Sequence, residues 1–382
     1  MRIAHITRDY PPHVRGGVSI AVEGLTLAYA STGHTCTVIS FEDWRPFKKA
    51  ANNTPAALRG HGDLKVLSVS SVTHLEGATD HVSRFTPDLL LCHDALLWDY
   101  TASLAVDLDI PAAFFVHVMH PWQDALRGLE EPTASTRAHH LAIHEADRIF
   151  CPSECVRDSL AQSHPRDADR FVHTPLGITT LPTAHARSAP TESPTVLIPG
   201  RLGDLKGTDL LLDVIPLITS QHPSVTFAFA GGVPGNARSE RRWRKKLARL
   251  GPSVEVRGWL NARQLSQAFE EATLVLLPSR CETFGLAAAE ALAHGRAVVA
   301  NGIPAHREIL LDGKCGMLTD DGSPEALARA TCDLLDDPEK RKRLETRGWL
   351  TARHRLLWEH SLPFHAHALA FFEGDSPRPG VD

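Results

Sequence analysis

The chain of 382 residues exceeds the size at which one hydrophobic core usually stops growing, so we expect two domains of about 180 residues each. Hydrophobic residues make up 43% and charged residues 22%, which is the balance of an ordinary globular enzyme. The formal net charge of -5 gives no electrostatic reason to expect nucleic acid as a partner. No apolar run approaches the roughly 18 residues that a membrane-spanning helix requires.

The N-terminal sequence MRIAHITRDYPP enters an apolar strand directly, without the core of a signal peptide, so we expect a cytoplasmic protein. Seven cysteines are scattered along the chain and none forms a C-x-x-C pair. We interpret them as reduced, buried thiols.

The first half of the chain alternates short apolar strands with segments of helix length. The first strand leads into a loop that ends at Gly16 and Gly17, and a helix is predicted from about Val18 to Thr32. Paired glycines let the backbone approach a ligand closely, and the absence of a G-x-G-x-x-G pattern argues against a nicotinamide cofactor. This alternation predicts a parallel sheet with helices on both faces. The strands expected in this half are Arg2–Thr7, Cys36–Phe41, Lys65–Val69, Leu89–Cys92, Ala112–Val116 and Arg148–Cys151.

Two further stretches of this half are interpreted as loop and turn. The polar segment from Glu42 to Asp63 contains Pro and Gly and is expected to be a long loop. The triplet Asp107-Leu108-Asp109 spells D-x-D, a known metal motif, but it precedes Ile110-Pro111 and a buried strand. We therefore interpret it as a turn that ends a helix.

His117 follows the apolar run AAFFV, at the carboxyl end of an expected strand, where open parallel sheets present groups to ligands. A buried structural histidine is an equally good interpretation of that position alone. Four other histidines lie nearby in sequence, and their spacing matches no standard zinc signature. We expect them to line a pocket or to lie on helix surfaces; they are His120, His139, His140 and His144.

A Pro-rich segment divides the chain. The phrase HTPLGI ends near Ile178, and residues 179–194 have the composition of a linker. A new strand, Thr195–Pro199, then runs into the loop GRLGDLKG. Arg201 and Lys206 lie in this loop, at a strand end and before a helix, so both cations can reach one diphosphate.

A strongly basic segment runs from Arg238 to Arg249 and has two interpretations. A basic amphipathic helix would suit the surface of an anionic membrane. The alternative is a solvated helix face, because the charges surround the helix and leave no single apolar face. The sequence favours the second interpretation.

The stretch PSRCETFGLAAAEALAHG lies between the apolar runs Ala272–Leu277 and Ala297–Ala300, which predicts a strand, a loop, a helix and a strand. Unpaired backbone N–H groups and the positive end of the helix dipole make such a loop an anion site. Glu282 is expected at the first turn, with Glu290 eight residues further on and facing the same side. Two carboxylates around an anion site suit a nucleotide sugar, which has phosphates between two groups rich in hydroxyls.

This pattern resembles the E-x7-E signature of retaining glycosyltransferases of family four. That family has the GT-B fold, in which two Rossmann-like, doubly wound α/β domains face each other across a cleft. The loop GRLGDLKG is similar to the family's G-R-L-x-x-x-K-G pattern, and a Gly-Gly loop and a strand-end His also match. One departure is Leu176, which stands where the family usually has Asn before Gly177.

The resemblance implies the following organisation. Residues 1–178 form an acceptor-binding domain, 179–194 a linker, and 195–355 a domain that binds the nucleotide sugar. Residues 356–372 form a terminal helix that crosses back to pack on the first domain, and 373–382 form a flexible tail.

The resemblance also implies roles for individual residues, in a reaction without metal or cofactor. Arg201, Lys206 and the amides near the helix start neutralise the leaving diphosphate, while Glu282 binds hydroxyls of the transferred sugar. Glu290 binds the ribose, and His117 positions the sugar near its reacting carbon. The catalytic set is therefore His117, Glu282, Arg201 and Lys206, and the remaining donor-binding residues are Gly16, Gly17, Gly258, Trp259, Leu260, Phe284, Gly285, Leu286 and Glu290.

The function that follows is transfer of a hexose or N-acetylhexosamine from a nucleotide sugar, with a UDP-sugar favoured, to a hydroxyl of a small molecule. A cationic acceptor such as an aminocyclitol, an intermediate of antibiotic biosynthesis, would suit the acidic residues of the first half. One alternative is a lipid or polysaccharide acceptor at a membrane, and another is a sugar-nucleotide isomerase or a non-catalytic binder of the same fold. The acidic residues are Asp94, Asp99, Asp124, Glu130 and Glu131.

Overall fold

The computed structural model describes residues 1–41, 57–61, 64–69, 75–179, 193–233 and 235–373. The chain forms two compact units. Unit 1 comprises Met1–Gly177 and Trp358–Asp382, and unit 2 comprises Ile178–Leu357. Each unit contains its own sheet with helices packed on it, so the fold is the pair of Rossmann-like α/β domains that the sequence predicts.

The sheet of unit 1 has eight strands in the order β3-β4-β2-β1-β5-β6-β7-β8. All neighbouring pairs are parallel except β3 and β4. The order reverses at β1, which has β2 on one side and β5 on the other. The carboxyl ends of β1 and β5 therefore form the switch point at which open α/β sheets bind ligands. The strands are β1 Arg2–Thr7, β2 Thr35–Ser40, β3 Ala57–His61, β4 Leu64–Ser68, β5 Leu89–Cys92, β6 Ala112–Phe115, β7 Arg148–Cys151 and β8 Phe171–His173.

The helices of unit 1 begin and end at residues suited to those positions. Thr133 and Ser153 cap the N-termini of two of them through their side chains. Asp109 ends another in a left-handed conformation with φ 53°, so the D-x-D triplet is the predicted helix-ending turn. The helices are α1 Gly17–Ser31, α2 Leu75–Phe85, α3 Trp98–Leu108, α4 His120–Leu126, α5 Ala134–Glu145, α6 Glu154–Ser163 and α14 Trp358–Glu373.

The long loop expected from Glu42 to Asp63 contains a strand. β3 pairs antiparallel with β4 at the edge of the sheet, so the loop prediction is wrong for Ala57–His61. The rest of that stretch lies outside the described residues. The same holds for most of the predicted linker and for the predicted tail, which fall on residues 180–192 and 374–382.

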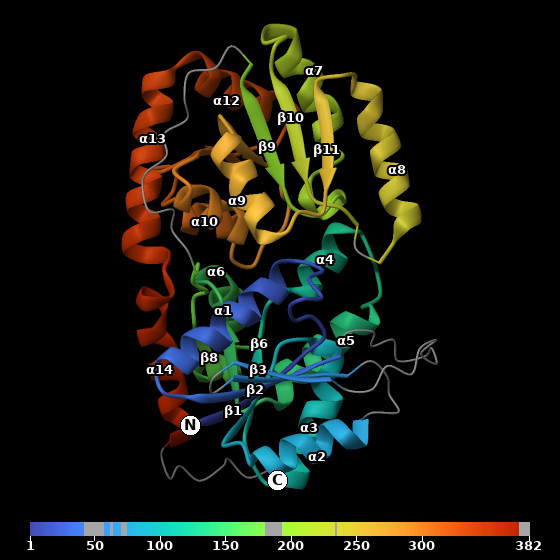
Figure 1. The fold of residues 1–382 in the computed structure, drawn as a ribbon, viewed down its shortest axis with the longest axis vertical. Helices are drawn as coiled ribbons and strands as arrows, with labels where there is room; N and C mark the ends of the chain where they lie inside the picture. Colours follow the sequence, from blue (N-terminus) through green and yellow to red (C-terminus); the bar gives the residue numbers. More distant parts are fainter. Residues whose placement is uncertain (42–56, 62–63, 70–74, 180–192, 234, 374–382) are drawn as a thin grey trace. The chain divides into compact units, whose positions relative to one another are not determined.

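The predicted terminal helix, residues 356–372, corresponds to α14 (Trp358–Glu373), which belongs to unit 1 as expected. α13 (Pro338–Thr351) belongs to unit 2, a π-helical turn follows at Ala352–Leu356, and α14 then begins at Trp358 in unit 1. α14 packs beside α1, as Figure 1 shows.

Close contacts fix α14 to the rest of unit 1. The indole of Trp358 packs so tightly on Gly24 of α1 that an added Cβ would lie 2.6 Å from its Nε1. His365 accepts a 2.8 Å hydrogen bond from the Tyr29 hydroxyl at Nδ1 and donates from Nε2 to the Pro175 carbonyl at 2.9 Å. Leu176, the departure from the family pattern, has a buried side chain.

The sheet of unit 2 has six parallel strands in the order β11-β10-β9-β12-β13-β14. Its order reverses between β9 and β12, so the switch point of this unit lies at their carboxyl ends. β12 and β13 are buried along their full length, as strands covered on both faces must be. The strands are β9 Thr195–Pro199, β10 Thr226–Ala230, β11 Val254–Gly258, β12 Leu274–Leu277, β13 Ala297–Asn301 and β14 Met317–Thr319.

Proline opens three helices of unit 2 at their first residue, where its missing N–H costs nothing. No helix in the described part of the chain is both long and apolar enough to cross a membrane. Besides α13, the helices of the unit are α7 Leu211–Gln221, α8 Ala237–Leu247, α9 Ala262–Glu271, α10 Leu286–Ala293, α11 Pro304–Ile309 and α12 Pro324–Asp336.

Most of the seven cysteines have the buried position that we expect. Cys155 and Cys281 are the exceptions and are only partly buried. Burial raises the pKa of the Cys36 and Cys92 thiols to about 12, so both are protonated at neutral pH.

Candidate active site

Two loops meet at the switch point of unit 2, one after β9 and one after β12. Gly207 of the first loop has φ 67°, and an added Cβ would lie only 2.0 Å from the Pro278 carbonyl oxygen of the second. The amide of Arg280 donates a 2.9 Å hydrogen bond to the Leu205 carbonyl. Glycine is therefore required at position 207 for the two backbones to approach this closely.

A bidentate ion pair joins the same two loops. The guanidinium of Arg280 donates to both carboxylate oxygens of Asp209, at 2.6 and 2.7 Å. It also donates to the Asp204 carbonyl at 2.5 Å. Fork geometry of this kind fixes orientation as well as distance, so Arg280 and Asp209 hold the loop that carries Lys206. Our sequence analysis did not select either residue.

Lys206 and Glu282 form the central pair of the site. The Lys206 Nζ lies 2.5 Å from Oε1 of Glu282, across 76 residues of sequence. Burial alone would raise the pKa of Glu282, but the charge of Lys206 and hydrogen bonds from Lys206 and Ser279 outweigh this effect and lower the pKa. Glu282 is therefore a carboxylate at neutral pH.

The position of Glu282 differs from the prediction. α10 begins at Leu286, with Gly285 before it in a left-handed conformation of φ 93°. Glu282 thus lies in the loop and not on the helix turn, so the expectation that it shares a helix face with Glu290 is wrong. The loop places it against Lys206 instead. Phe284, in the same loop, is buried.

Arg201 follows β9 directly and is exposed. It makes no ion pair or hydrogen bond with any residue that the structure describes. The first amide groups of α10 likewise have no acceptor within the helix, as at every helix N-terminus. The β9 and β12 loops of this switch point therefore contain an unpaired guanidinium, the Lys206 ammonium and a helix start.

Glu290 lies in the second turn of α10 and is partly buried. Its carboxyl makes no hydrogen bond or ion pair within the described residues. Burial raises its pKa to about 7. Glu282 and Glu290 therefore differ in charge state near neutral pH, although the sequence motif treats them as a pair.

Asn301 bonds directly to the loop after β12, and His306 bonds to Asn301. The Asn301 side chain donates to the Pro278 carbonyl at 2.8 Å, and Nδ1 of His306 bonds to the Asn301 backbone oxygen at 2.8 Å. Burial lowers the pKa of His306, although the nearby Glu282 opposes this. Asn301 ends β13, and its place at a strand end was the only sequence signal for this role.

The segment Gly258–Leu260 lies at the carboxyl end of β11, two strands away from β9. Trp259 is 43% exposed, so it does not belong to the core of unit 2. In the described part of the chain, no hydrogen bond or ion pair connects this segment with the loops around Lys206 and Glu282.

In unit 1, His117 lies two residues after β6 and is the first of three buried histidines in a row. Its Nε2 lies 2.9 Å from Nδ1 of His93, and Nε2 of His93 lies 3.0 Å from Nδ1 of His5. These residues come from the neighbouring strands β6, β5 and β1. Only His117 was selected from the sequence, because neighbouring strands cannot be deduced from a single chain segment.

Burial keeps the three rings neutral. It lowers the pKa of His5 and of His117 to about 3, and it lowers that of His93 well below the usual value. Nε2 of His5 is buried and has no hydrogen-bond partner in the part of the chain that the structure describes. Because an orphaned N–H costs more than an orphaned lone pair, we assign the protons so that each ring donates toward His117. This tautomer leaves Nδ1 of His117 carrying a proton.

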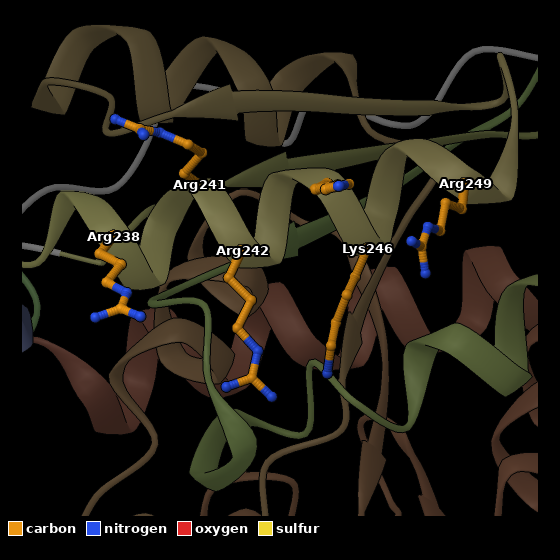
Figure 2. Close-up of a pocket in the computed structure, with 6 residues that line it drawn as sticks. Arg238, Arg241, Arg242, Lys246 and Arg249 are labelled. Carbon is orange, nitrogen blue, oxygen red and sulfur yellow. The ribbon is translucent and has the colours of Figure 1, made fainter.

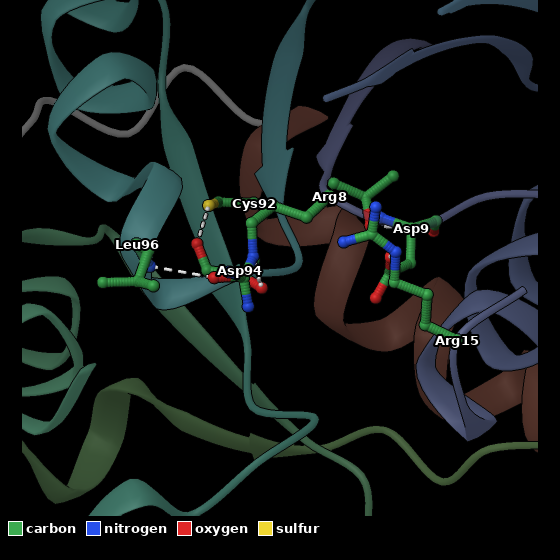
Figure 3. Close-up of polar contacts among 7 residues, drawn as sticks. Arg8, Asp9, Arg15, Cys92, Asp94 and Leu96 are labelled. Atoms are coloured by element: carbon green, nitrogen blue, oxygen red, sulfur yellow. Dashed lines mark hydrogen bonds and ion pairs between the residues drawn. The ribbon is translucent and has the colours of Figure 1, made fainter. Parts of the chain in front are cut away.

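The switch point of unit 1 carries an ion pair. Arg8 follows β1 and Asp94 follows β5, and their side chains lie together in Figure 3. Nε of Arg8 is 2.5 Å from Oδ2 of Asp94. Asp94 also accepts a 2.9 Å hydrogen bond from the Leu96 amide. Gly16 and Gly17 lie at the start of α1, after the same loop that carries Arg8. Sequence analysis missed Arg8, although an arginine directly after the first strand was a usable signal.

The acidic residues proposed for a cationic acceptor are partly engaged elsewhere. Asp94 is paired with Arg8, and Asp124 is buried and accepts hydrogen bonds from the Thr133 amide and the Thr136 hydroxyl. Asp124 therefore supports the start of α5, and we remove it from the acceptor set. His139 is also buried, which corrects its expected place on a helix surface. In the described parts of the two units, no group of three or more His, Cys, Asp or Glu side chains has an arrangement that could hold a metal ion.

Two family models match the chain in sequence. The model described as Glycosyltransferase Family 4 matches residues 15–180, and the model described as Glycosyl transferases group 1 matches residues 183–349. Together they cover most of both units. The chain therefore belongs to the family-four glycosyltransferases of GT-B fold, as its motifs imply.

Individual relatives are more distant. The chain is 26% identical to a D-inositol 3-phosphate glycosyltransferase of Streptomyces scabiei over 68% of its length, and it covers 64% of that relative. It is 26% identical to the alpha-maltose-1-phosphate synthase of Mycolicibacterium smegmatis, over 94% of this chain and 96% of that protein.

Solved structures show the same fold. Sucrose-phosphate synthase from Thermosynechococcus elongatus superposes with a TM-score of 0.80 at 20% identity, covering 98% of this chain and 99% of that one. Anabaena HepE, solved in complex with UDP-glucose, superposes with a TM-score of 0.73 at 17% identity, covering 98% and 99%.

Proposed function

We propose that the protein is a retaining glycosyltransferase. It moves a hexose or N-acetylhexosamine from a nucleotide sugar, with a UDP-sugar favoured, to a hydroxyl of a small molecule. The observation that carries the proposal is the Lys206–Glu282 pair at the switch point of unit 2, with Arg201 in the same β9 loop and without a partner among the described residues. Cations for a diphosphate and a carboxylate for sugar hydroxyls are the groups that such a donor requires. The UDP-glucose complex of Anabaena HepE supports the choice of nucleotide.

In this proposal, the bond between the anomeric carbon and the diphosphate breaks, and negative charge develops on the leaving oxygen. Arg201, Lys206 and the amides of Gly285 and Leu286 stabilise that charge as preorganised donors. The acceptor oxygen bonds to the anomeric carbon on the same face, and its proton passes to the leaving diphosphate. This proposed reaction accounts for every bond and for the proton, and it uses neither a metal ion nor a covalent intermediate.

The remaining residues orient the donor. Glu282 accepts hydrogen bonds from hydroxyls of the transferred sugar, and Glu290 accepts hydrogen bonds from the ribose. His117 positions the sugar as a neutral donor, because its low pKa keeps it from becoming charged. Such orientation accounts for a large part of the rate when reacting atoms are held close.

We propose a polyhydroxylated acceptor such as a cyclitol. The Arg8–Asp94 pair at the switch point of unit 1 offers hydrogen-bond donors and acceptors together, which suits hydroxyls better than an isolated cationic group. An aminocyclitol remains within this class, and the engagement of Asp94 and Asp124 means that an amine is not required for binding.

A thermal-shift panel of UDP-, GDP-, ADP- and dTDP-sugars tests the donor. A ligand at 100 times its dissociation constant stabilises the folded protein by about 2.7 kcal/mol, so one nucleotide should raise the melting temperature clearly. Product analysis then identifies the reaction. A transferase releases free sugar slowly and glycosylates a polyol, an isomerase returns an altered nucleotide sugar, and a binder leaves the donor intact. Either of the last two results would contradict the proposal.

His93 and His5 are positioning residues for His117 in this proposal. We expect His93→Leu to lower kcat about tenfold, the value of one lost hydrogen bond and the orientation it provides, with little change in the KM of the donor. His93→Gln keeps an amide that can donate to Nε2 of His117 and should retain more activity. The tautomer of His117, read from its ¹⁵N chemical shifts, should change in His93→Leu.

His139→Leu is the matched control, because His139 is equally buried in unit 1 and lies outside the row. It should keep the activity and the His117 tautomer of the wild type. Equal losses in His93→Leu and His139→Leu would show that the row acts only through stability.

A further inference from the structure

Helix α8 and the 3-10 turn that follows it, Ala248–Leu250, carry a row of cations along one face. Four of these cations follow one another at intervals of three or four residues and therefore lie in one row: Arg238, Arg242, Lys245 and Arg249. Arg241 and Lys246 lie on either side of this row. Figure 2 shows Arg238, Arg242 and Lys246 reaching to the same side of the helix. These six side chains line one surface pocket, and we refer to them as the basic stripe.

The opposite face of α8 is fixed in the core. Trp243 and Leu247, one turn apart, are buried against the sheet of unit 2. The expectation that charges surround this helix without leaving an apolar face is therefore wrong. Arg244 anchors the helix further, with a 3.1 Å hydrogen bond to the Val256 carbonyl of the edge strand β11. The basic stripe consequently faces away from the core and cannot turn inward.

The charges of the basic stripe are not balanced within the described part of the chain. None of its six residues forms an ion pair there. Glu240, the single carboxylate of α8, is paired with Arg244 at 3.0 Å. Lys246 lies over the Trp243 ring at 4.6 Å, which leaves its charge without an anionic partner. The whole chain has a net charge of -5, so this local excess of positive charge runs against its composition.

We propose that the basic stripe binds the surface of an anionic phospholipid bilayer. From Arg238 to Arg249 the stripe extends about 16 Å, which is too long for one diphosphate but matches several neighbouring headgroups. Guanidinium groups bind phosphate oxygens in pairs, and four of the six cations are arginines. A plane of lipid phosphates satisfies all of them together.

The composition of the stripe also defines how it binds. No large apolar side chain of α8 is exposed, so the helix adsorbs to the headgroups and does not insert among the acyl chains. No exposed aromatic ring lies within α8 to stack on nucleobases, which argues against single-stranded nucleic acid. Binding of this kind is electrostatic and is weakened strongly by salt.

Vesicle sedimentation tests this proposal with the full-length protein. We expect the wild type to bind vesicles of phosphatidylcholine mixed with phosphatidylglycerol at low salt, to release them at high salt, and to leave pure phosphatidylcholine vesicles unbound. The variant with Arg238, Arg242, Lys245 and Arg249 changed to Gln should bind two to three orders of magnitude more weakly, at roughly fivefold for each charge.

The matched control changes four other exposed cations of unit 2, Arg263, Lys342, Arg343 and Arg347, to Gln. It removes the same net charge and should bind anionic vesicles within a few-fold of the wild type. Equal weakening in both variants, equal binding to neutral vesicles, or binding to single-stranded DNA without binding to anionic vesicles would each overturn the proposal. The result does not depend on the donor or the acceptor of the proposed reaction.

Discussion

Replacing Lys206 by Ala is expected to lower kcat/KM for glycosyl transfer by about a thousandfold or more. Removal of one preorganised donor to a developing negative charge costs about a hundredfold to a thousandfold. Lys206 also lies 2.5 Å from Glu282. Without it, burial dominates the environment of Glu282 and raises its pKa, so the carboxylate that binds the sugar is weakened as well. Steady-state kinetics with the preferred nucleotide sugar measures the loss.

Two further variants separate charge from structure. The double variant Lys206→Ala with Glu282→Gln removes the unpaired carboxylate and should regain the free energy of unfolding lost in the single variant, but not the activity. Lys342→Ala removes an exposed lysine of the same unit and should be as active as the wild type. Near-normal turnover by Lys206→Ala would refute the role of Lys206 in binding the diphosphate.

Strand ends were the most predictable part of this site. Arg201 and Lys206 follow β9, and Glu282 follows β12, in motifs whose alternation of apolar runs and loops is visible in the sequence. The position of Glu282 relative to the helix was not predictable, because the first turn of an Ala-rich helix has no sharp sequence limit before Gly285. Its contact with Lys206 depends on the pairing of β9 with β12, which no local pattern encodes.

Contacts between segments that are distant in sequence could not be predicted from the sequence. Arg280 and Asp209 are ordinary charged residues until the two loops meet, and His5 and His93 become partners of His117 only when β1, β5 and β6 lie side by side. Helix α8 shows the opposite error. Its many charges led to the prediction that the helix has no apolar face. Two apolar residues one turn apart, Trp243 and Leu247, were nevertheless enough to bury one face.

Glu290 should make donor binding depend on pH near neutrality. Its carboxylate form accepts hydrogen bonds from two ribose hydroxyls, and burial raises its pKa to about 7 in the free protein. Below that pKa the carboxyl is protonated and must lose its proton for the donor to bind. We therefore expect the affinity for the nucleotide to rise as the pH increases from about 6 to about 8, and to level off above. Titration calorimetry with UDP, or with the nucleotide that the panel selects, measures this change.

Titration of neighbouring side chains does not account for this pH dependence of nucleotide affinity. Burial lowers the pKa values of His294 and His306, so both rings stay neutral across this range. Glu282 stays ionised, because the charge of Lys206 and hydrogen bonds from Lys206 and Ser279 lower its pKa despite burial. Glu290→Gln should bind the nucleotide more weakly and without this pH dependence. An unchanged pH dependence in Glu290→Gln would assign the titration to another group.

Glu290→Gln should weaken nucleotide binding but raise the free energy of unfolding above neutral pH. Glu290 has a higher pKa in the folded state than the ordinary carboxyl of the unfolded chain, so between the two values the folded state binds more protons. The free energy of unfolding then falls as the pH rises through this interval, and the loss is complete above about pH 7. Glu290→Gln avoids burying a charge, so at about pH 8 it should be more stable than the wild type without ligand, by at most about 3 kcal/mol. Thermal unfolding at about pH 5 and pH 8 tests this expectation. If the buried charge of Glu290 destabilises the fold, Glu290→Gln is more stable than the wild type at about pH 8 and not at about pH 5.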